Sequence, residues 1–366
     1  MKVLYLANFP QADQAWERWK TGQKRESPEH GLWGATHLHN YGIETDLLPY
    51  EKYTALKKIS RFLKLGDIDL QFRAFLALSK YDLVYSSSQT GTLFLAFLRA
   101  IGILRKPVVV KLERPFNVNF LTKIILPLFA RGHDKILCLS SRVENQLHDE
   151  FGIPKSKLAL LDWGPDLPSY DEEKQGQSAE MNPPIIISAG NISRDYNSLA
   201  EAVRNLNCSV HIYCSKSSAP TIDNLPEQVK CQYKHPTATT ALTWQDLVMK
   251  YEKSYAVAIP LEIPESRVDN TPLYGLTSLL DAMAMGKAVI MTYHRQVNID
   301  VVKEGIGLWV EPGDVKGWEK AIAYLLDHPE ETEQMGKRAL QLAKEKYNLD
   351  TFSSQLAVAL KSTIKQ

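Results

Sequence analysis

Short apolar runs alternate with amphipathic segments along the whole chain, and this alternation restricts the fold more than any other feature of the sequence. Such runs lie at residues 2–7, 44–48, 81–85, 107–111, 135–139 and 157–161, and again at 185–188, 210–214, 255–259, 288–292 and 308–310. Patterns with helical spacing lie between them, among others at 31–40, 92–102 and 141–151. Strands that alternate with helices are typical of βαβ units and parallel sheets. We therefore predict an α/β protein.

The composition changes in the middle of the chain. Residues 162–184 contain four prolines and the polar run DEEKQGQS, which is typical of a linker. A chain of 366 residues suits two domains. We expect a Rossmann-like domain at 1–170, a linker at 171–184, a second Rossmann-like domain at 185–348 and a C-terminal helix at 349–366. Doubly wound sheets bind ligands at the carboxyl ends of their strands, so we expect the site there, in a cleft between the domains.

Charge and cysteine content exclude several classes of protein. The 43 Lys and Arg residues nearly balance 42 Asp and Glu residues, which argues against a dedicated nucleic-acid-binding protein. The four cysteines form no C-x-x-C pair and are too few for a disulfide scaffold, which favours a reducing compartment. No apolar run reaches the ~18–20 residues of a membrane-spanning helix, and the nine histidines show no metal-ligand spacing. We predict a cytoplasmic protein that binds no metal.

The segment 270–292, NTPLYGLTSLLDAMAMGKAVIMT, predicts an anion-binding helix. Gly275 precedes a run with one apolar helix face, so Thr277 or Ser278 lies in the first turn. Free backbone N–H groups and the positive end of the helix dipole bind anions at that position. Asp281 follows about one turn later, where a carboxylate can accept hydrogen bonds from sugar hydroxyls. A capped βαβ helix without a ligand has the same pattern, so both interpretations stay open.

The run GLTSLLDAMAMGKAVI at 275–290 strongly resembles the donor-binding helix of the family-four retaining glycosyltransferases of the GT-B fold (the group 1 glycosyltransferases). Residues 305–314, GIGLWVEPGD, are similar to a second segment of that family, and the likeness extends over most of 134–350. It implies a GT-B fold with two Rossmann-like doubly wound domains, the C-terminal helix crossing back to the N-terminal domain. It also implies metal-independent transfer of a sugar from a nucleotide-diphosphate sugar, UDP- or GDP-linked, to a hydroxyl. The acceptor would be a glycan or a lipid-linked molecule of polysaccharide or glycolipid synthesis.

Two positions depart from the family's E-x7-E motif. Asp281 stands in place of the second Glu, and Leu273 stands in place of the first. In the family, the first acid is often assigned to contacts with the transferred sugar. A non-catalytic sugar-nucleotide-binding or scaffold protein of the GT-B fold is therefore an alternative to a transferase. A GT-B epimerase, which the same cleft could serve, is another.

In the family, the donor diphosphate is bound by the loop that corresponds to the one after the run 185–188. It is also bound by the first-turn N–H groups of the donor-binding helix, which correspond to those near Leu276 here. Gly190, Asn191 and Arg194 match donor-binding positions, and a guanidinium suits phosphate because it donates two parallel hydrogen bonds. Asn191 stands where relatives often carry a further Arg. The basic residues proposed to replace it are Lys216 and Arg267. Alternatively, Arg194 forms a surface ion pair with its neighbour Asp195.

The first half of the chain should bind the acceptor. Glu113 follows the apolar run 107–111, so we expect it at the carboxyl end of a strand, where it would face the reacting carbon as a catalytic group. Lys111 and Arg114 would keep it ionised or contact phosphate. A solvated charge cluster before a proline turn explains these three residues equally well.

Two further segments of the first half carry weaker signals. The expected loop 8–22 contains Phe9, Trp16 and Trp19, which could stack on a sugar or a lipid head group. Residues 52–78 mix cationic and apolar side chains with amphipathic spacing, which suits peripheral contact with an anionic membrane at its inner face. A helix that covers an α/β sheet has a similar pattern.

Overall fold

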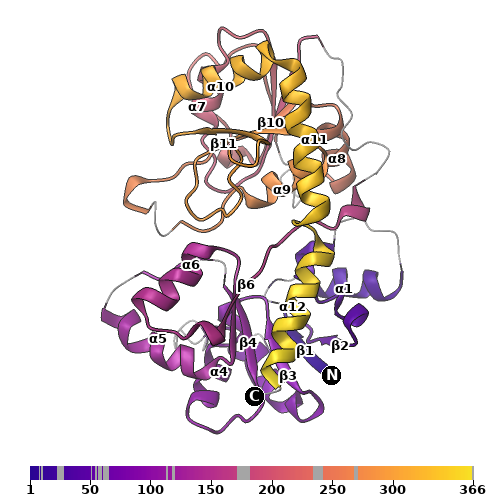
Figure 1. The fold of residues 1–366 in the computed structure, drawn as a ribbon, viewed down its shortest axis with the longest axis vertical. Coiled ribbons are helices and arrows are strands. Elements are labelled where there is room, and N and C mark those ends of the chain that lie inside the picture. Colours follow the sequence, from indigo (N-terminus) through magenta and orange to yellow (C-terminus); the bar gives the residue numbers. More distant parts are fainter. Residues whose placement is uncertain are drawn as a thin grey trace. The chain divides into compact units, whose positions relative to one another are not determined.

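The computed structural model describes residues 1–7, 9, 11–22, 29–50, 52–53, 56, 60, 66–112, 114–117, 120–170, 182–233, 242–267 and 271–364. The chain divides into two compact units (Figure 1). The first unit comprises Met1–Gly164 together with Leu349–Gln366, and the second comprises Pro165–Asn348. Each unit is built on a six-stranded sheet.

The sheet of the first unit has the order β2-β1-β3-β4-β5-β6, and its neighbouring strands are parallel. Its strands are β1 (Lys2–Leu6), β2 (Glu44–Leu47), β3 (Leu83–Ser86), β4 (Val108–Leu112), β5 (Lys135–Cys138) and β6 (Leu158–Leu160). The inner strands are continuous apolar runs because helices cover both of their faces. The strand order changes direction between β1 and β3, which is the switch point where such sheets bind ligands.

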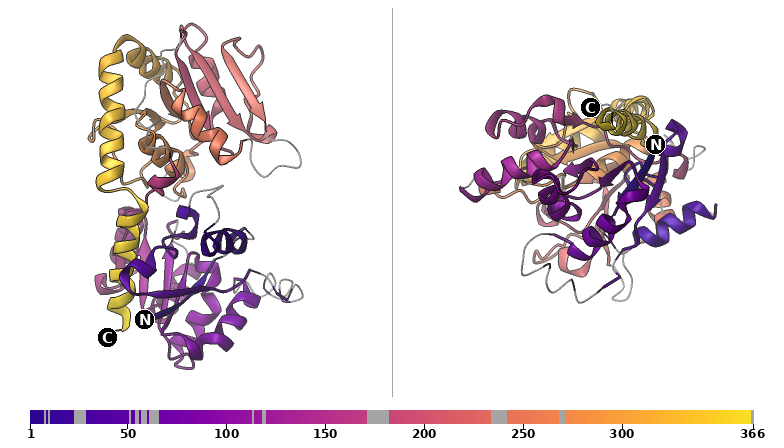
Figure 2. Two further views of the ribbon diagram at one scale, coloured as in Figure 1. Left: turned by 90° about the vertical axis from the view of Figure 1, so that its right-hand side faces the viewer. Right: turned by 90° about the horizontal axis from the view of Figure 1, so that it is seen from below.

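Helices cover the two faces of this sheet. The longer ones are α1 (Ala12–Lys20), α3 (Ile68–Ala77), α4 (Leu93–Ala100), α5 (Phe120–Gly132), α6 (Ser141–Asn145) and α12 (Leu349–Ile364). Side chains alternate along a strand, and Val108, Val110 and Leu112 of β4 share the face that packs beneath α3 to α6. Lys111 points to the opposite face, where η1 (Glu29–Leu32) and η2 (Leu38–Tyr41) lie together with α12 (Figure 2).

The last helix, α12, completes the core of the first unit. Its side chains Phe352 and Leu356 are buried, and they approach Gly34 so closely that a Cβ atom there would lie 3.1 Å from either of them. Two hydrogen bonds join Gln355 to Asp162. The Asp162 amide donates to Oε1 of Gln355 (2.8 Å), and Nε2 of Gln355 donates to the Asp162 carboxylate (3.1 Å). These contacts attach α12 to the first unit.

The sheet of the second unit has the order β12-β11-β10-β7-β8-β9, again parallel throughout. Its strands are β7 (Ile185–Ala189), β8 (Ser209–Cys214), β9 (Val229–Tyr233), β10 (Ala256–Ile259), β11 (Ala288–Thr292) and β12 (Gly307–Val310). The strand order changes direction between β7 and β10, so the loop after β7 lies at a second switch point.

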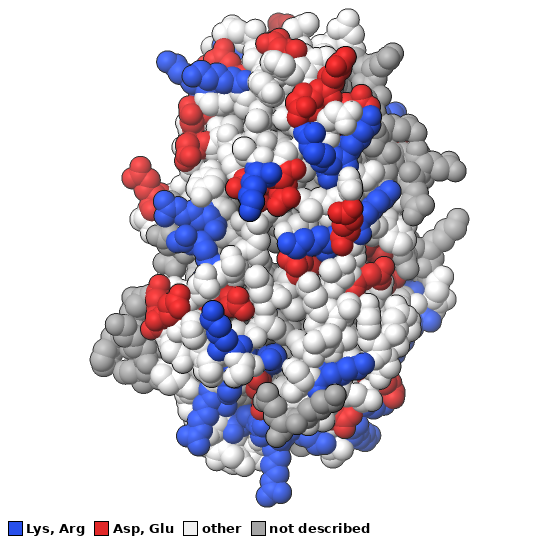
Figure 3. All heavy atoms as spheres, in the orientation of Figure 1, with Lys and Arg blue, Asp and Glu red and all other residues white. Residues whose placement is uncertain are grey.

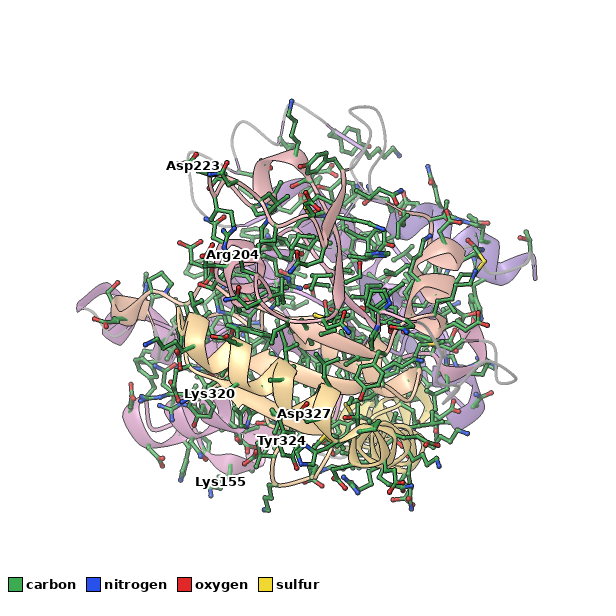
Figure 4. All side chains as sticks on the ribbon, turned by 90° about the horizontal axis from the view of Figure 1, so that it is seen from above. Lys155, Arg204, Asp223, Lys320, Tyr324 and Asp327 are labelled. Atoms are coloured by element: carbon green, nitrogen blue, oxygen red, sulfur yellow. The ribbon has the colours of Figure 1, made fainter. Side chains whose placement is uncertain are left out.

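The longer helices of the second unit are α7 (Tyr196–Ala202), α8 (Trp244–Glu252), α9 (Leu276–Ala284), α10 (Val315–Asp327) and α11 (Pro329–Glu345). Helix α10 is amphipathic. Trp318 and Ile322 are buried in the core of the unit, whereas Lys320, Tyr324 and Asp327 lie on its outer side (Figure 4).

The structure confirms the α/β class and contains every predicted strand within two residues of its expected bounds. It adds β9, which the sequence did not reveal because only Val229 of this edge strand is fully buried. The helix expected at 31–40 is wrong: Trp33 and Gly34 have φ values of 50° and 74°, so two short 3₁₀ helices replace it.

Other expectations need correction or lie outside the described residues. Residues 12–20 form α1 rather than a loop, because Ala12 and Trp16 are buried one turn apart. The helix expected at 141–151 changes to a π-helix at Gln146–Glu150. Residues 171–181 of the predicted linker are outside the described ranges. Among the described residues, no helix is both long and apolar enough to cross a membrane.

Candidate functional site

Two glycines shape the carboxyl edge of the second sheet. Gly190 follows β7 with a φ of 146°, and a Cβ atom there would lie 2.4 Å from Nη2 of Arg194. Gly275 precedes α9 with a φ of 79°, and a Cβ atom there would lie 2.9 Å from Cγ2 of Ile259. A residue with a side chain would be strained at both positions. Gly190 therefore lets the loop after β7 lie close to Arg194, and Gly275 lets the start of α9 lie close to Ile259 and Met291.

Arg194 is half-buried, and its guanidinium has no acidic partner among the described residues. Nη2 donates to Oγ of Ser278 (3.0 Å) and to the Ala189 carbonyl (3.3 Å), and Nη1 donates to the Ile192 carbonyl (3.3 Å). Nε is buried and has no hydrogen-bond partner. No carboxylate of a described residue forms an ion pair with it, and burial lowers the pKa of Arg194. A guanidinium stays protonated in proteins, so a positive charge is held here that no carboxylate of the described residues neutralises.

The alternative ion pair between Arg194 and Asp195 is not formed. The carboxylate of Asp195 caps α7 instead, accepting a hydrogen bond from the Ser198 amide (3.0 Å). The guanidinium of Arg194 instead donates hydrogen bonds to two backbone carbonyls and to the hydroxyl of Ser278.

The start of α9 adds a second electropositive element beside Arg194. Ser278 lies in the first turn of α9, and its hydroxyl contacts both the guanidinium and the Ala189 carbonyl (3.1 Å). Leu276 is buried, and Thr277 beside it is exposed. The first-turn N–H groups have no acceptor within the helix. A guanidinium next to a helix N-terminus favours a phosphate or another anion.

The neighbouring loop after β8 is tied to this site. The side chain of Asn191 accepts a hydrogen bond from the Ser215 amide (2.5 Å), and the Asn191 carbonyl accepts one from the Ser218 hydroxyl (2.7 Å). Lys216 lies exposed on the same loop. The structure thus brings the predicted residues of the loop after β7 and of the α9 start together, with Lys216 beside them. The side chain of Arg267 is outside the described part of the chain.

Asp281 is placed differently from the expectation of a carboxylate open to ligand hydroxyls. It is buried, and Oδ1 accepts a hydrogen bond from the Tyr170 hydroxyl at 2.6 Å. Burial raises the pKa of Asp281 to about 7, and the bond from Tyr170 partly offsets that rise. Trp244 packs edge-on against Tyr170 with the ring centroids 5.0 Å apart. Direct contact between Asp281 and a ligand would require Tyr170 to move.

Tyr251 completes this buried cluster. Its hydroxyl is buried without a hydrogen-bond partner. Burial raises the pKa of Tyr251, the Asp281 charge raises it further, and Arg194 opposes the rise. Sequence reasoning missed both tyrosines, because Tyr170 lies in a stretch with the composition of a linker and Tyr251 lies in an ordinary amphipathic helix.

In the first unit, Lys111 is enclosed rather than exposed. It is fully buried, and Nζ stands 3.3 Å from the ring centroid of Trp33. Trp33 stacks on Trp163 at 4.5 Å between centroids, and His30 packs edge-on against Trp163. The sequence gave no indication of this aromatic cover. As the structure stands, Lys111 is not open to a ligand.

The other residues predicted for the acceptor are spread over the first unit. Trp16 is buried between Tyr5 and Trp19 in the core, so the expectation that it stacks on a ligand needs correction. Trp19 and Phe9 are half-buried, and Arg114 is exposed. Glu113 lies outside the described residues.

Comparison with known proteins shows similarity to a family of glycosyltransferases in the region of this site. Residues 275–342, which include α9, β11, β12 and α10, match the model of the family described as Glycosyl transferases group 1. No curated protein sequence matches the chain. Solved GT-B glycosyltransferase structures match it over nearly its whole length, which confirms the predicted GT-B fold.

Three of these structures illustrate the likeness. A glycosyltransferase from Rickettsia africae is 14% identical, covers 100% of this chain and 99% of its own, and has a TM-score of 0.71. Sucrose-phosphate synthase from Thermosynechococcus elongatus is 13% identical with 100% of both chains covered and a TM-score of 0.69. HepE of Anabaena in complex with UDP-glucose is 15% identical, covers 99% and 100% of the two chains, and has a TM-score of 0.63.

Proposed function

We propose that this chain is a retaining glycosyltransferase that transfers a sugar from a nucleotide-diphosphate sugar to a hydroxyl group. The observation that carries the proposal is the half-buried Arg194 guanidinium, which pairs with no carboxylate of the described residues and lies beside the start of α9. The match of residues 275–342 to the group 1 family and the GT-B fold support sugar transfer as the reaction.

In this proposal the site acts mainly on the leaving group. Negative charge develops on the diphosphate as the bond to the sugar breaks, and preorganised donors aimed at that charge stabilise the transition state. Arg194, the Ser278 hydroxyl and the N–H groups near Thr277 would supply them. A charge-assisted hydrogen bond of this kind is worth ~1.5–3 kcal/mol. Glu113 is proposed as the group that faces the sugar from the first unit.

The substrates follow from the same reasoning. HepE was solved with UDP-glucose, which favours a UDP-linked donor, with a GDP-linked donor as the second choice. We propose a glycan or lipid-linked acceptor in polysaccharide or glycolipid synthesis, no further cofactor or metal, and a cytoplasmic enzyme at the inner face of a membrane. Lys216 and Arg267 are proposed as further contacts to the donor phosphates.

Nucleotide binding tests the anion site directly. Arg194→Ala should weaken the binding of UDP or GDP at least tenfold and leave uridine or guanosine binding nearly unchanged, as measured by calorimetry. Arg204→Ala is the matched control, because Arg204 lies in the same unit but forms an exposed pair with Glu201 (Figure 4). Equal losses for nucleotide and nucleoside, or no loss for either, would show that Arg194 does not bind phosphate.

A non-catalytic sugar-nucleotide-binding protein is the second candidate, and a GT-B epimerase the third. The binding protein is favoured by Leu273, which stands where the family's first motif acid would be, whereas the same fold could also serve an epimerase. Slow donor hydrolysis without acceptor separates the transferase from a binding protein, since a binding protein would saturate with nucleotide and release no sugar. Conversion of the donor into its stereoisomer would identify the epimerase.

A further inference from the structure

Two buried polar side chains lie at the carboxyl end of β11, next to the loops that form the candidate site. Thr292 is 1% exposed and His294 is 2% exposed, whereas Tyr293 between them is 41% exposed. Side chains of an extended segment point alternately to opposite sides, so Thr292 and His294 both face the interior of the second unit. Buried polar groups are almost always hydrogen-bonded, and the partners of these two lie in the loops after β10 and before α9.

His294 joins the loop after β11 to the loop before α9. Its Nε2 atom lies 2.9 Å from the Pro272 carbonyl oxygen, and its Nδ1 atom lies 3.2 Å from the Gln296 amide nitrogen. A carbonyl only accepts and an amide N–H only donates, so Nε2 carries the ring proton and Nδ1 does not. Burial lowers the pKa of His294, although the bond to Pro272 opposes this. The ring is therefore neutral at pH 7, as this set of partners requires.

The bond from His294 fixes the residues that lead into α9. The Pro272 carbonyl also accepts a hydrogen bond from the Tyr274 amide (2.6 Å), which closes a tight turn just before the helix. Gly275 follows, and it packs so closely that a Cβ atom there would lie 3.0 Å from Cε of Met291. The start of α9 is therefore fastened at two points to β11 and the loop that follows it.

Thr292 supports the segment that carries Arg194. Its Oγ1 atom accepts a hydrogen bond from the amide of Leu261 (2.8 Å), in the loop after β10. Leu261 pairs with Arg194 in an antiparallel β-bridge, and two further backbone hydrogen bonds of 3.2 and 3.0 Å flank this bridge. The backbone of Arg194 is therefore held, through Leu261, by the end of β11.

The two supports converge on the anion site, which consists of the Arg194 guanidinium and the start of α9. Nη2 of Arg194 lies 3.0 Å from Oγ of Ser278 in the first turn of α9. Leu261 also packs against the start of this helix, since a Cβ atom on Gly275 would lie 3.2 Å from its Cδ1 atom. One anion can contact a guanidinium and a helix N-terminus together only if both are held within ~0.5 Å of the required positions.

The surface charge of the second unit is a poor substitute for such a site. On the face of that unit shown in the upper part of Figure 3, the described basic side chains are interspersed with acidic ones. Opposite charges at short range cancel much of each other's field, so this face attracts a phosphate weakly. We therefore expect phosphate binding to depend on the geometry of the anion site.

We propose that Thr292 and His294 are positioning residues of the anion site. Thr292 holds the backbone of Arg194, and His294 holds the start of α9. Neither side chain contacts the phosphate; each keeps one half of the site at the position that the other half requires. The inference rests on the proposed function, because it takes the donor phosphates to bind between Arg194 and α9.

Calorimetry of nucleotide binding tests both residues, with UDP or GDP as the probe, whichever binds the wild-type chain more tightly. His294→Leu fills much of the space of the ring but removes the donor to Pro272. The nucleotide affinity should fall about fivefold or more, with the affinity for the nucleoside nearly unchanged. His294→Gln should restore most of the affinity, because its amide N–H can donate to the same carbonyl. Thr292→Val keeps the shape of the side chain, removes the acceptor for Leu261 and should cause a similar loss.

Two buried residues with other partners are matched controls. Both ring nitrogens of His133, in the first unit, form hydrogen bonds within the protein, of 2.8 and 3.0 Å. The hydroxyl of Thr332, near the start of α11, donates to two backbone carbonyls at 3.0 Å, one of them at the end of α10. His133→Leu and Thr332→Val should lower the Tm as the site variants do but leave the nucleotide affinity unchanged. Circular dichroism verifies that each variant is folded.

Double variants distinguish positioning from a general loss of stability. Thr292 acts on the phosphate through Arg194, so Thr292→Val should cost no further affinity in a chain that already carries Arg194→Ala. His294 acts through α9, so His294→Leu should still weaken binding in that chain. Independent losses of stability would instead give the same fold-change with and without Arg194→Ala for both residues.

Failure of this inference can be told apart from failure of the proposed function. If Arg194→Ala weakens nucleotide binding but His294→Leu and Thr292→Val do not, the positioning roles are wrong and the anion site stands. Equal losses of nucleotide and nucleoside affinity, or equal losses in the two control variants, would also overturn the positioning roles. If Arg194→Ala leaves nucleotide binding unchanged, the anion site itself is refuted and the inference falls with it.

Discussion

The buried carboxyl group of Asp281 should make the stability of the second unit depend on pH. Its pKa rises from an ordinary 3.8 to about 7, mainly because burial penalises the charged form. A carboxyl group whose folded pKa is raised binds its proton more tightly in the folded chain. Its contribution is therefore complete below the unfolded pKa and is lost as the pH rises through the folded value. At ~1.4 kcal/mol per pKa unit, the whole loss is about 4 kcal/mol.

Asp281→Asn removes this dependence. An amide cannot ionise, and its oxygen can still accept the hydrogen bond from Tyr170. We expect the free energy of unfolding of the wild type, relative to the variant, to fall by about 2 kcal/mol between about pH 5 and pH 7. Urea unfolding followed by tryptophan fluorescence measures it, because Trp244 packs against Tyr170 and reports on this cluster.

Asp300 is the control, because its pKa shift has the opposite sign to that of Asp281. Hydrogen bonds from the Trp309 ring nitrogen (2.9 Å) and from the Val302 and Lys303 amides lower the pKa of Asp300. Its contribution is present above its unfolded pKa and lost only at lower pH. Asp300→Asn should thus lower stability by a constant amount between about pH 5 and pH 7. If Asp281→Asn has the same pH dependence as the wild type in that range, the reasoning about Asp281 is wrong.

Three other changes have defined outcomes. Gly190→Ala should displace the Arg194 guanidinium, because the new Cβ would lie 2.4 Å from Nη2. Calorimetry should then show UDP or GDP binding weakened at least tenfold and nucleoside binding retained, and unchanged nucleotide affinity would contradict this. Glu113→Gln should lower turnover in a donor-release assay with little change in donor affinity, and normal turnover would remove Glu113 from the reaction. Tyr170→Phe should move the stability loss of Asp281 to higher pH in urea unfolding, since the lost hydroxyl lowers the pKa; a move to lower pH would refute this.

The strands could be predicted from the sequence because most of them are buried on both faces. A central strand of a parallel sheet is a continuous apolar run, so its position shows directly in the sequence. The edge strand β9 lacks such a run: Lys230, Gln232 and Tyr233 point to solvent, and only its pairing with β8 defines it. The residues 31–40 suit a helix by spacing, but Trp33 and Gly34 have positive φ values, and Gly34 packs closely against α12, which lies more than 300 residues away in sequence.

The sequence predicted the candidate site only where its residues lie in short continuous segments. Gly190, Arg194 and Ser278 lie in short segments whose spacing and family likeness indicate an anion site, and the structure brings them together. Tyr170 and Asp281 are 111 residues apart in sequence, so nothing near either one predicts their hydrogen bond. Likewise, a lysine at the end of an apolar strand gives no sign that Trp33 covers it.

The position of α12 also determines the order in which the chain can fold. Met1–Gly164 leaves the ribosome before the second unit and α12, so its core lacks Phe352 and Leu356 until the entire second unit has been synthesised. Domains usually fold as units during synthesis, the N-terminal one first. Here the second unit, which is continuous in sequence, can reach its final structure before the first. The surface around Gly34 stays uncovered during that interval, so the nascent chain should need protection from aggregation there until α12 has been synthesised.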